Sequence, residues 1–441
     1  MAFRSALAAL ALLLTVAGQA RAQQTQAKEE RPTGLPKKVE WTFNFDAGLG
    51  MFGFAHSLYQ NRPDRPTDSL SDNWLESSAK PALSGIWHLG GKHGELFGKF
   101  SAVGERTFAA PPPLVGAEAS SFKVEDMYIG WRCPKDCPRN PVEFIVGRAP
   151  YRIGHGMLVW DGASEGGSRG AFWSNARKAW AFAAIGRFTP KHHTLEGFYL
   201  DRDELPESQT GTRLFGVNYE YALGSASTFG ATFMRAIADS LVARDGMNVY
   251  NLRAYTAPLR KLPALSFELE YALEKNGDLL SSYAWNAKVA YELSKLKWKP
   301  TLSYRYAIFE GDDPSTPQSE AFDPLITGFY DWGTWWQGEI GGEYFLSNSN
   351  LISHQIRVHV TPSDNISGGV FGYLFSLQRA PAAITSKDLL TELDGYCDWK
   401  ANSNFTISFI AALATPKDAV KQVFNRTDSF VYGMIYVAYS Y

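Results

Sequence analysis

The sequence predicts an all-β fold, a transmembrane antiparallel β-barrel of about 18 strands with short periplasmic turns and long extracellular loops. Three observations predict it. Apolar and polar residues alternate along most of the chain, short and long connectors alternate between the predicted strands, and the last segment is an amphipathic strand that ends on tyrosine. Because lipid offers no hydrogen bonds to a sheet edge, such strands should close into a barrel.

The composition excludes several other classes of protein. Aromatic residues make up 14% of the chain, which is too many for a disordered protein. Three cysteines in 441 residues are too few for a disulfide-stabilised scaffold. With 43 basic and 45 acidic residues the formal charge is −2, so no basic surface for nucleic acid is indicated.

The first 40 residues are expected to lie outside the barrel. Residues 1–22 have the features of a cleaved signal peptide: Arg4 precedes an apolar stretch, and Ala20 and Ala22 offer small side chains at the cleavage site. Residues 23–40 are polar and predict a flexible leader, and residues 41–441 predict one barrel domain. We therefore expect the mature protein in the outer membrane of a Gram-negative cell, in contact with lipid and lipopolysaccharide.

The alternation is strict over long stretches. In residues 41–51, Trp41, Phe43 and Phe45 fall on one face of an extended chain, while Thr42 and Asn44 fall on the other. The same period-two pattern recurs in residues 265–273, 283–293, 302–308, 356–360 and 405–413. It predicts strands with one apolar and one polar face, and helical spacing is nowhere sustained.

Connectors of two lengths separate the predicted strands. Short ones contain the Gly, Pro, Asn or Lys of tight turns and lie at residues 90–94, 189–192, 224–227, 257–263, 294–297, 361–365 and 400–403. Long ones lie between them, at residues 53–73, 108–120, 153–169 and 310–350. Short turns at one rim and long loops at the other are typical of outer-membrane barrels. Residues 429–441 predict the closing strand.

Polar-face residues would line an aqueous lumen, because a barrel of this size leaves a channel unless loops fill it. We expect these pore-lining or selectivity residues: Arg148, Arg152, Arg213, Arg253, Lys288, Arg305, Arg357, Glu268 and Glu292. Two interpretations remain open. The charges can form an ion-pair network that keeps the wall rigid, or they can form a ladder that presents arginines to an anion.

Two long loops are candidate constrictions or gates. Residues 153–170 are rich in glycine, which permits a tight inward path, and we expect Trp160, Asp161 and Arg169 to narrow the pore there. The alternative is a surface loop that contacts lipopolysaccharide. The loop at residues 310–350 carries Trp332 and Trp335 and could fold over the mouth of the barrel as a gate.

The three cysteines have separate roles in this interpretation. Cys133 and Cys137 lie in the segment Cys-Pro-Lys-Asp-Cys-Pro within a predicted periplasmic turn, and an oxidising compartment favours a disulfide between them. Cys397 alternates with Leu393 and Trp399 on an apolar face, where a thiol should be an inert small residue. The histidines are scattered and no metal-binding motif occurs, so we expect neither a metal nor a cofactor.

Two stretches suggest a family. The segment GRAPYRIGHGMLVWDG, and more strongly DPLITGFYDWGTWWQGEIGGEYFLSNSNLISHQI, resemble the alginate-export family of outer-membrane proteins. The resemblance implies a barrel that passes an acidic exopolysaccharide through an arginine-rich pore with loops as gates. It also implies periplasmic export-complex proteins as partners.

The sequence therefore favours a channel, not an enzyme. We expect an outer-membrane porin for anionic or sugar-like solutes, and the resemblance adds export of an acidic polysaccharide such as alginate. The alternatives are a barrel enzyme and a general diffusion porin for uptake. An enzyme would need a nucleophile beside a base. Ser353 and His354 are adjacent, but neighbouring strand residues point to opposite faces and cannot pair directly.

Overall fold

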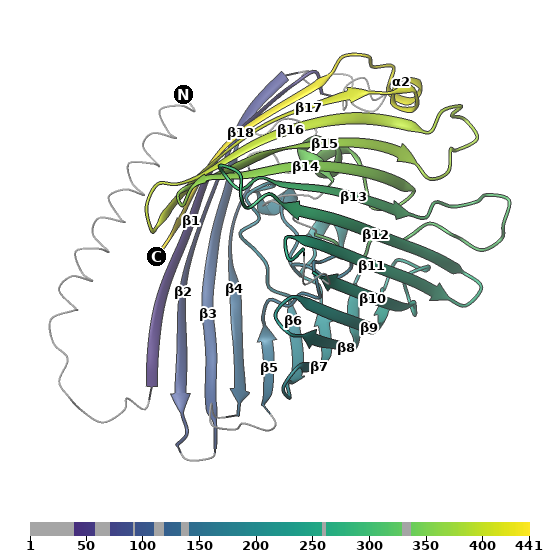
Figure 1. Ribbon diagram of the computed structural model, residues 1–441. Coiled ribbons are helices and arrows are strands. Elements are labelled where there is room, and N and C mark those ends of the chain that lie inside the picture. The colour runs from purple at the N-terminus through teal and green to yellow at the C-terminus, as the bar shows by residue number, and fades with distance from the viewer. Residues whose placement is uncertain are drawn as a thin grey trace.

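The computed structural model describes residues 39–57, 71–90, 93–109, 119–133, 141–257, 262–328 and 337–441 (Figure 1). They form one antiparallel sheet of 18 strands, as predicted. The strands are β1 (Val39–Ala55), β2 (Ser71–His88), β3 (Glu95–Phe108), β4 (Ser120–Arg132), β5 (Val142–Arg148), β6 (Phe182–Phe188), β7 (His193–Asp201), β8 (Arg213–Leu223), β9 (Ser227–Ile237), β10 (Asn248–Thr256), β11 (Leu265–Asn276), β12 (Leu280–Glu292), β13 (Thr301–Phe309), β14 (Leu351–Ser363), β15 (Ile366–Leu377), β16 (Asp388–Lys400), β17 (Phe405–Pro416) and β18 (Phe430–Ser440). The predicted signal peptide at 1–22 and nearly all of the predicted leader lie outside the described residues.

The sheet closes on itself. Each strand pairs with its sequence neighbours, and β1 pairs with both β2 and β18, so that Gly53 lies opposite Asn73 on one side and Gly433 on the other. Figure 1 shows β18 running beside β1. A closed sheet has no unpaired edge, and this satisfies the requirement that lipid imposes on a membrane-spanning sheet.

Connector lengths follow the predicted asymmetry. At the rim where β1 begins and β18 ends, turns as short as 189–192, 224–226 and 364–365 join the strands. At the other rim the loops include 109–119, 149–181 and 310–350, and the single tight connection there is 277–279. The loop predicted at 153–169 is longer than expected, because β5 ends at Arg148 and β6 begins only at Phe182.

The two faces of the wall also follow the prediction, with two exceptions. On β10, Leu252 is exposed on the outer face while Arg253 is buried on the inner one. Arg213 was predicted to line the pore, but it alternates in phase with the exposed residues Phe215 and Val217, so it belongs to the outer face. Arg148 is likewise paired in register with the exposed Met127 and not with a lumenal residue.

Short helical segments lie in the loops. They are η1 (Gly167–Arg169), η2 (Pro206–Ser208), the π-helix η3 (Gly338–Phe345) and α2 (Asp418–Phe424), the last labelled near the upper rim in Figure 1. None of the helices in the described residues is both long and apolar enough to cross a bilayer.

Candidate functional site

The β5–β6 loop, residues 149–181, crosses the lumen. At one wall the backbone N–H groups of Trp173 and Ser174 each donate to Glu76 Oε2 on β2 at 2.8 Å. Near the other wall, His155 N–H donates to the hydroxyl of Tyr255 on β10 at 3.2 Å. Because β2 and β10 lie on opposite sides of an 18-strand barrel, one loop spans the interior. This is the inward path that the glycines of the segment predicted.

The β13–β14 loop, residues 310–350, meets the first loop inside the barrel. Val159 and Ile326 form a parallel bridge, with Trp160 N–H donating to Ile326 C=O at 2.9 Å and Ile326 N–H donating to Leu158 C=O at 3.1 Å. Gly156 has φ +85°, and a Cβ there would lie 2.2 Å from the Trp160 ring. Glycine is therefore required where the first loop turns under this tryptophan.

The predicted constriction residues Trp160 and Asp161 form one cluster with Arg152. The Arg152 guanidinium donates to Asp161 Oδ1 at 2.7 and 2.9 Å, and its Cζ lies 3.7 Å from the Trp160 ring centroid. Lys178 Nζ is 3.6 Å from the other Asp161 oxygen. The side chains of Arg152 and Lys178 are 37% and 43% exposed, whereas Asp161 is 3% exposed. The accessible part of this cluster is therefore basic.

A second group of charges lies on the facing wall. In the register of β11, β12 and β13, Glu268 lies opposite Lys288 and Lys288 lies opposite Arg305. Lys288 Nζ and Arg305 Nη2 each lie 3.4 Å from a Glu268 oxygen, and His155 Nδ1 of the crossing loop lies 3.5 Å from the same carboxylate. The His155 ring stacks on Tyr255 with 3.9 Å between the centroids. One acid thus faces two permanent cations and a histidine.

Three other predicted pore residues have different surroundings. Arg253 is buried in the wall, where it donates to Thr232 Oγ1 at 2.8 Å and lies 3.2 Å from Glu220. Arg357 Nη2 donates to the Tyr396 hydroxyl at 2.6 Å. Glu292 is exposed at the end of β12. For Arg253 and Arg357, the contacts match the alternative of a rigid wall network.

Arg169 and Arg148 belong to a cluster built around Asp203, in the β7–β8 loop. Arg148, Arg169 and Arg177 donate to the Asp203 carboxylate at 2.7, 2.8 and 2.5 Å. Burial raises the pKa of Asp203, but the hydrogen bond and charge of Arg148 and the charges of Arg169 and Arg177 outweigh it, so that this pKa lies below its ordinary value. Asp203 therefore fixes the crossing loop near both of its ends.

The other lumenal loop is attached to the wall through η3. Ile340 and Gly341 N–H donate to the two oxygens of Glu392 on β16, both at 2.7 Å, and Glu339 N–H donates to Asp394 Oδ2 at 3.1 Å. The wall carboxylates thereby accept hydrogen bonds from the N–H groups at the start of a helix, which have no partner within it. Trp332 and Trp335, the predicted gate residues of this loop, lie outside the described residues.

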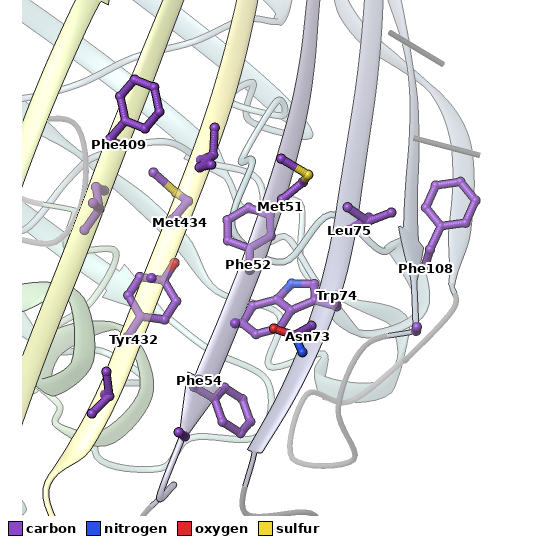
Figure 2. A pocket seen from close by; sticks show the side chains of 17 residues that line it. Met51, Phe52, Phe54, Asn73, Trp74, Leu75, Phe108, Phe409, Tyr432 and Met434 are labelled. Carbon is purple, nitrogen blue, oxygen red and sulfur yellow. The ribbon is translucent and has the colours of Figure 1, made fainter. Parts of the chain in front are cut away.

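Aromatic side chains join both loops to the wall beside η3. Figure 2 shows Phe52 and Phe54 on β1 next to Trp74 on β2, with Tyr432 on the neighbouring strand. Phe52 stacks on Trp74 at 5.1 Å between centroids, and Tyr344 of η3 lies 5.6 Å from Tyr432. A groove of about 840 Å³ lies at this seam of β1, β2 and β18, and its lining includes the exposed outer-face residues Met51, Val431 and Ile435. The loops therefore rest on an apolar wall on this side and on a charged wall on the other.

Two further predictions concern reactive side chains. Ser353 is buried on the inner face, and His354 faces outward and lies 2.9 Å from the hydroxyl of Tyr304, so the two cannot act as a nucleophile and its base. Cys397 is a half-buried free thiol on the outer face of β16, as predicted. Cys137 lies outside the described residues, so the Cys133–Cys137 disulfide stays a prediction.

Comparison with known proteins supports the fold through structure alone. No family model and no curated protein matches the chain. Acinetobacter baumannii OccAB4 is similar with a TM-score of 0.58 and 11% identity, over 92% of this chain and 99% of that one. Pseudomonas aeruginosa OccK7 (OpdD) has a TM-score of 0.56 and 10% identity, over 92% and 99%. A BenF-like porin from Pseudomonas fluorescens Pf-5 has a TM-score of 0.56 and 11% identity, over 91% and 98%.

These likenesses correct the family prediction. The resemblance to the alginate-export family is wrong, because the barrel matches structures of Occ and Opd proteins and a BenF-like porin over nearly its full length. At 10–11% identity the likeness shows a shared barrel fold. The described parts of the two segments that suggested the exporter, residues 149–162 and residues 323–328 with 337–350, belong to the lumenal loops.

Proposed function

We propose that the chain is an outer-membrane porin through which small anionic solutes enter by diffusion. The supporting architecture is a closed barrel whose interior is narrowed by two loops. Loops that cross the interior narrow the passage, which favours a small molecule over a polymer chain in transit. Uptake of small solutes, as in a general diffusion porin, fits this arrangement better than polysaccharide export.

The observation that carries the proposed charge preference is the unequal exposure of acids and bases at the constriction. Arg152 and Lys178 are partly exposed, and the acid between them is buried. Across from them, Lys288 and Arg305 each lie 3.4 Å from Glu268. A positive constriction in a narrow low-dielectric passage concentrates anions and repels cations.

The test is ion selectivity of the folded full-length protein in planar lipid bilayers. In a salt gradient, the reversal potential of the wild type should have the sign that indicates anion selectivity. The double variant Arg152→Gln, Lys178→Gln should lose most of this selectivity. Arg106→Gln is a matched control, because Arg106 is exposed on the outer face of β3. A cation-selective wild type, or a double variant as selective as the control, would reject the proposal.

Solute class can be tested separately by liposome swelling. A small carboxylate should enter wild-type proteoliposomes faster than a neutral sugar of similar size. Equal rates for the two solutes, together with an unselective reversal potential, would instead support a general diffusion porin.

A further inference from the structure

The outward-facing cations of the barrel strands gather at one rim. They are Arg106, Arg213, Arg235 and Lys275, and each lies toward the strand end that leads into the loops on the long-loop side. The alternation sets their direction. Arg235 is exposed and in phase with the exposed Phe233 on β9, and Lys275 is exposed and in phase with the exposed Tyr271 on β11.

The register brings two of these cations into one row. Asn248 on β10 lies opposite Arg235 on one side and opposite Lys275 on the other. Since neighbouring strands are about 4.8 Å apart, the two Cα atoms are separated by roughly 10 Å. Two long basic side chains at that separation can bind one anionic group between them.

These two cations lack the partners that lumenal cations have. On the inner face, Lys99, Arg187 and Arg253 each lie within 3.2 Å of a carboxylate oxygen. In the part of the chain that the structure describes, no carboxylate lies within ion-pair distance of Arg235 or Lys275, and the hydrogen bond of Lys275 goes to Ser281 Oγ.

The acids of the β9–β10 loop at this rim are engaged elsewhere. Asp239 pairs with Arg213 at 2.6 Å, and Asp245 Oδ1 accepts a hydrogen bond from Ala238 N–H. Directly below the basic row, the outer face carries exposed apolar side chains, among them Phe233, Tyr250 and Tyr271. A basic row above an apolar, aromatic band matches the boundary between lipid headgroups and acyl chains.

We propose that Arg235 and Lys275 form a binding site for the phosphate groups of lipopolysaccharide. The long-loop rim of such a barrel is in the outer leaflet, where the lipid is a phosphorylated glycolipid. Its phosphates supply the negative charge that the protein lacks here, and its acyl chains cover the apolar band below. The proposal rests on the proposed outer-membrane location and is independent of what passes through the lumen.

The test is lipid binding to the folded, delipidated full-length protein in detergent, measured by native mass spectrometry. Lipopolysaccharide with phosphorylated lipid A should bind the wild type, and the double variant Arg235→Gln, Lys275→Gln should bind it about 30-fold more weakly, at about fivefold per charge. The charge-conserving exchange Arg235→Lys, Lys275→Arg should retain binding. A charge-matched control is Lys191→Gln, Lys295→Gln, because both lysines are exposed in turns at the opposite rim.

Two results would overturn the proposal. One is equal binding of lipopolysaccharide by the double variant and the charge-matched control. The other is equal binding of phosphatidylglycerol and lipopolysaccharide by the wild type, which would make the row a general anionic-lipid surface. Dephosphorylated lipopolysaccharide should bind the wild type and the double variant equally weakly. Because the readout is lipid binding in detergent, its failure can be told apart from failure of the transport proposal.

Discussion

Asp203 is the residue whose loss should most loosen the loop that crosses the lumen. Its carboxylate accepts charge-assisted hydrogen bonds from Arg148, Arg169 and Arg177. Asparagine keeps the size of the side chain but loses the charge and one of two acceptor oxygens. Removing one partner of a buried ion pair costs about 3–5 kcal/mol, and Arg177 is buried. We therefore expect Asp203→Asn to lower the free energy of loop opening by about that amount.

The control for this variant is Asp239→Asn. Asp239 also pairs with an arginine, Arg213, but Asp239 is exposed and Arg213 is only half-buried, so its loss should cost about 0.2–1 kcal/mol. It removes the same charge without touching the crossing loop.

Limited proteolysis of the folded barrel in detergent measures the difference. Trypsin can cut after Arg169, Arg177 and Lys178 only when the loop opens. A change of about 3 kcal/mol corresponds to a roughly hundredfold larger open population and a proportionate rise in cleavage rate. If Asp203→Asn is cut no faster than Asp239→Asn, Asp203 does not anchor the loop.

Three further predictions concern the same loops. The pKa of Asp203 is lowered, so its stabilising contribution is present above the ordinary aspartate pKa and lost as pH falls below about 4; tryptophan fluorescence of the folded barrel should report loosening there, and Asp203→Asn should remove this acid transition. Burial and the neighbouring Glu105 hold the pKa of Glu165 well above its ordinary value. Its contribution is therefore lost as pH rises from the ordinary glutamate pKa through that raised pKa, and Glu165→Gln should remove this second transition; a wild type with a flat pH profile would contradict both assignments. Replacing Glu392 by alanine leaves the N–H groups of Ile340 and Gly341 without an acceptor, at about 1–3 kcal/mol each, and single-channel recordings should show larger or noisier currents than in the wild type.

The period-two alternation made the barrel predictable. Strand identity, closure and loop asymmetry depend on local patterns, so they could be inferred from residues such as Trp41–Met51 and from turn composition. The inward path of the β5–β6 loop was also within reach, because glycines such as Gly156 are needed where the chain passes under Trp160.

The partners of the site residues could not be predicted, because they depend on how the loops cross the interior. Nothing local marks Asp203 as the acceptor of three arginines or Glu76 as the anchor of Trp173. Arg213 is different, because the sequence already shows that it alternates in step with the apolar residues Phe215 and Val217. This pattern indicates the outer face of the barrel. The family prediction was wrong because it rested on loop composition, and glycines that permit tight turns, such as Gly156 beside Trp160, are useful to loops inside barrels of more than one family.

The crossing loop also has a mechanical consequence. A hollow cylinder flattens easily when squeezed from the side, but one with an internal crossbeam does not. Residues 149–181 are hydrogen-bonded to β2 at one wall and to β10 at the other. The loop therefore braces the barrel across its interior. The crossing loop should therefore help the barrel to keep its width against the lateral pressure of the surrounding bilayer.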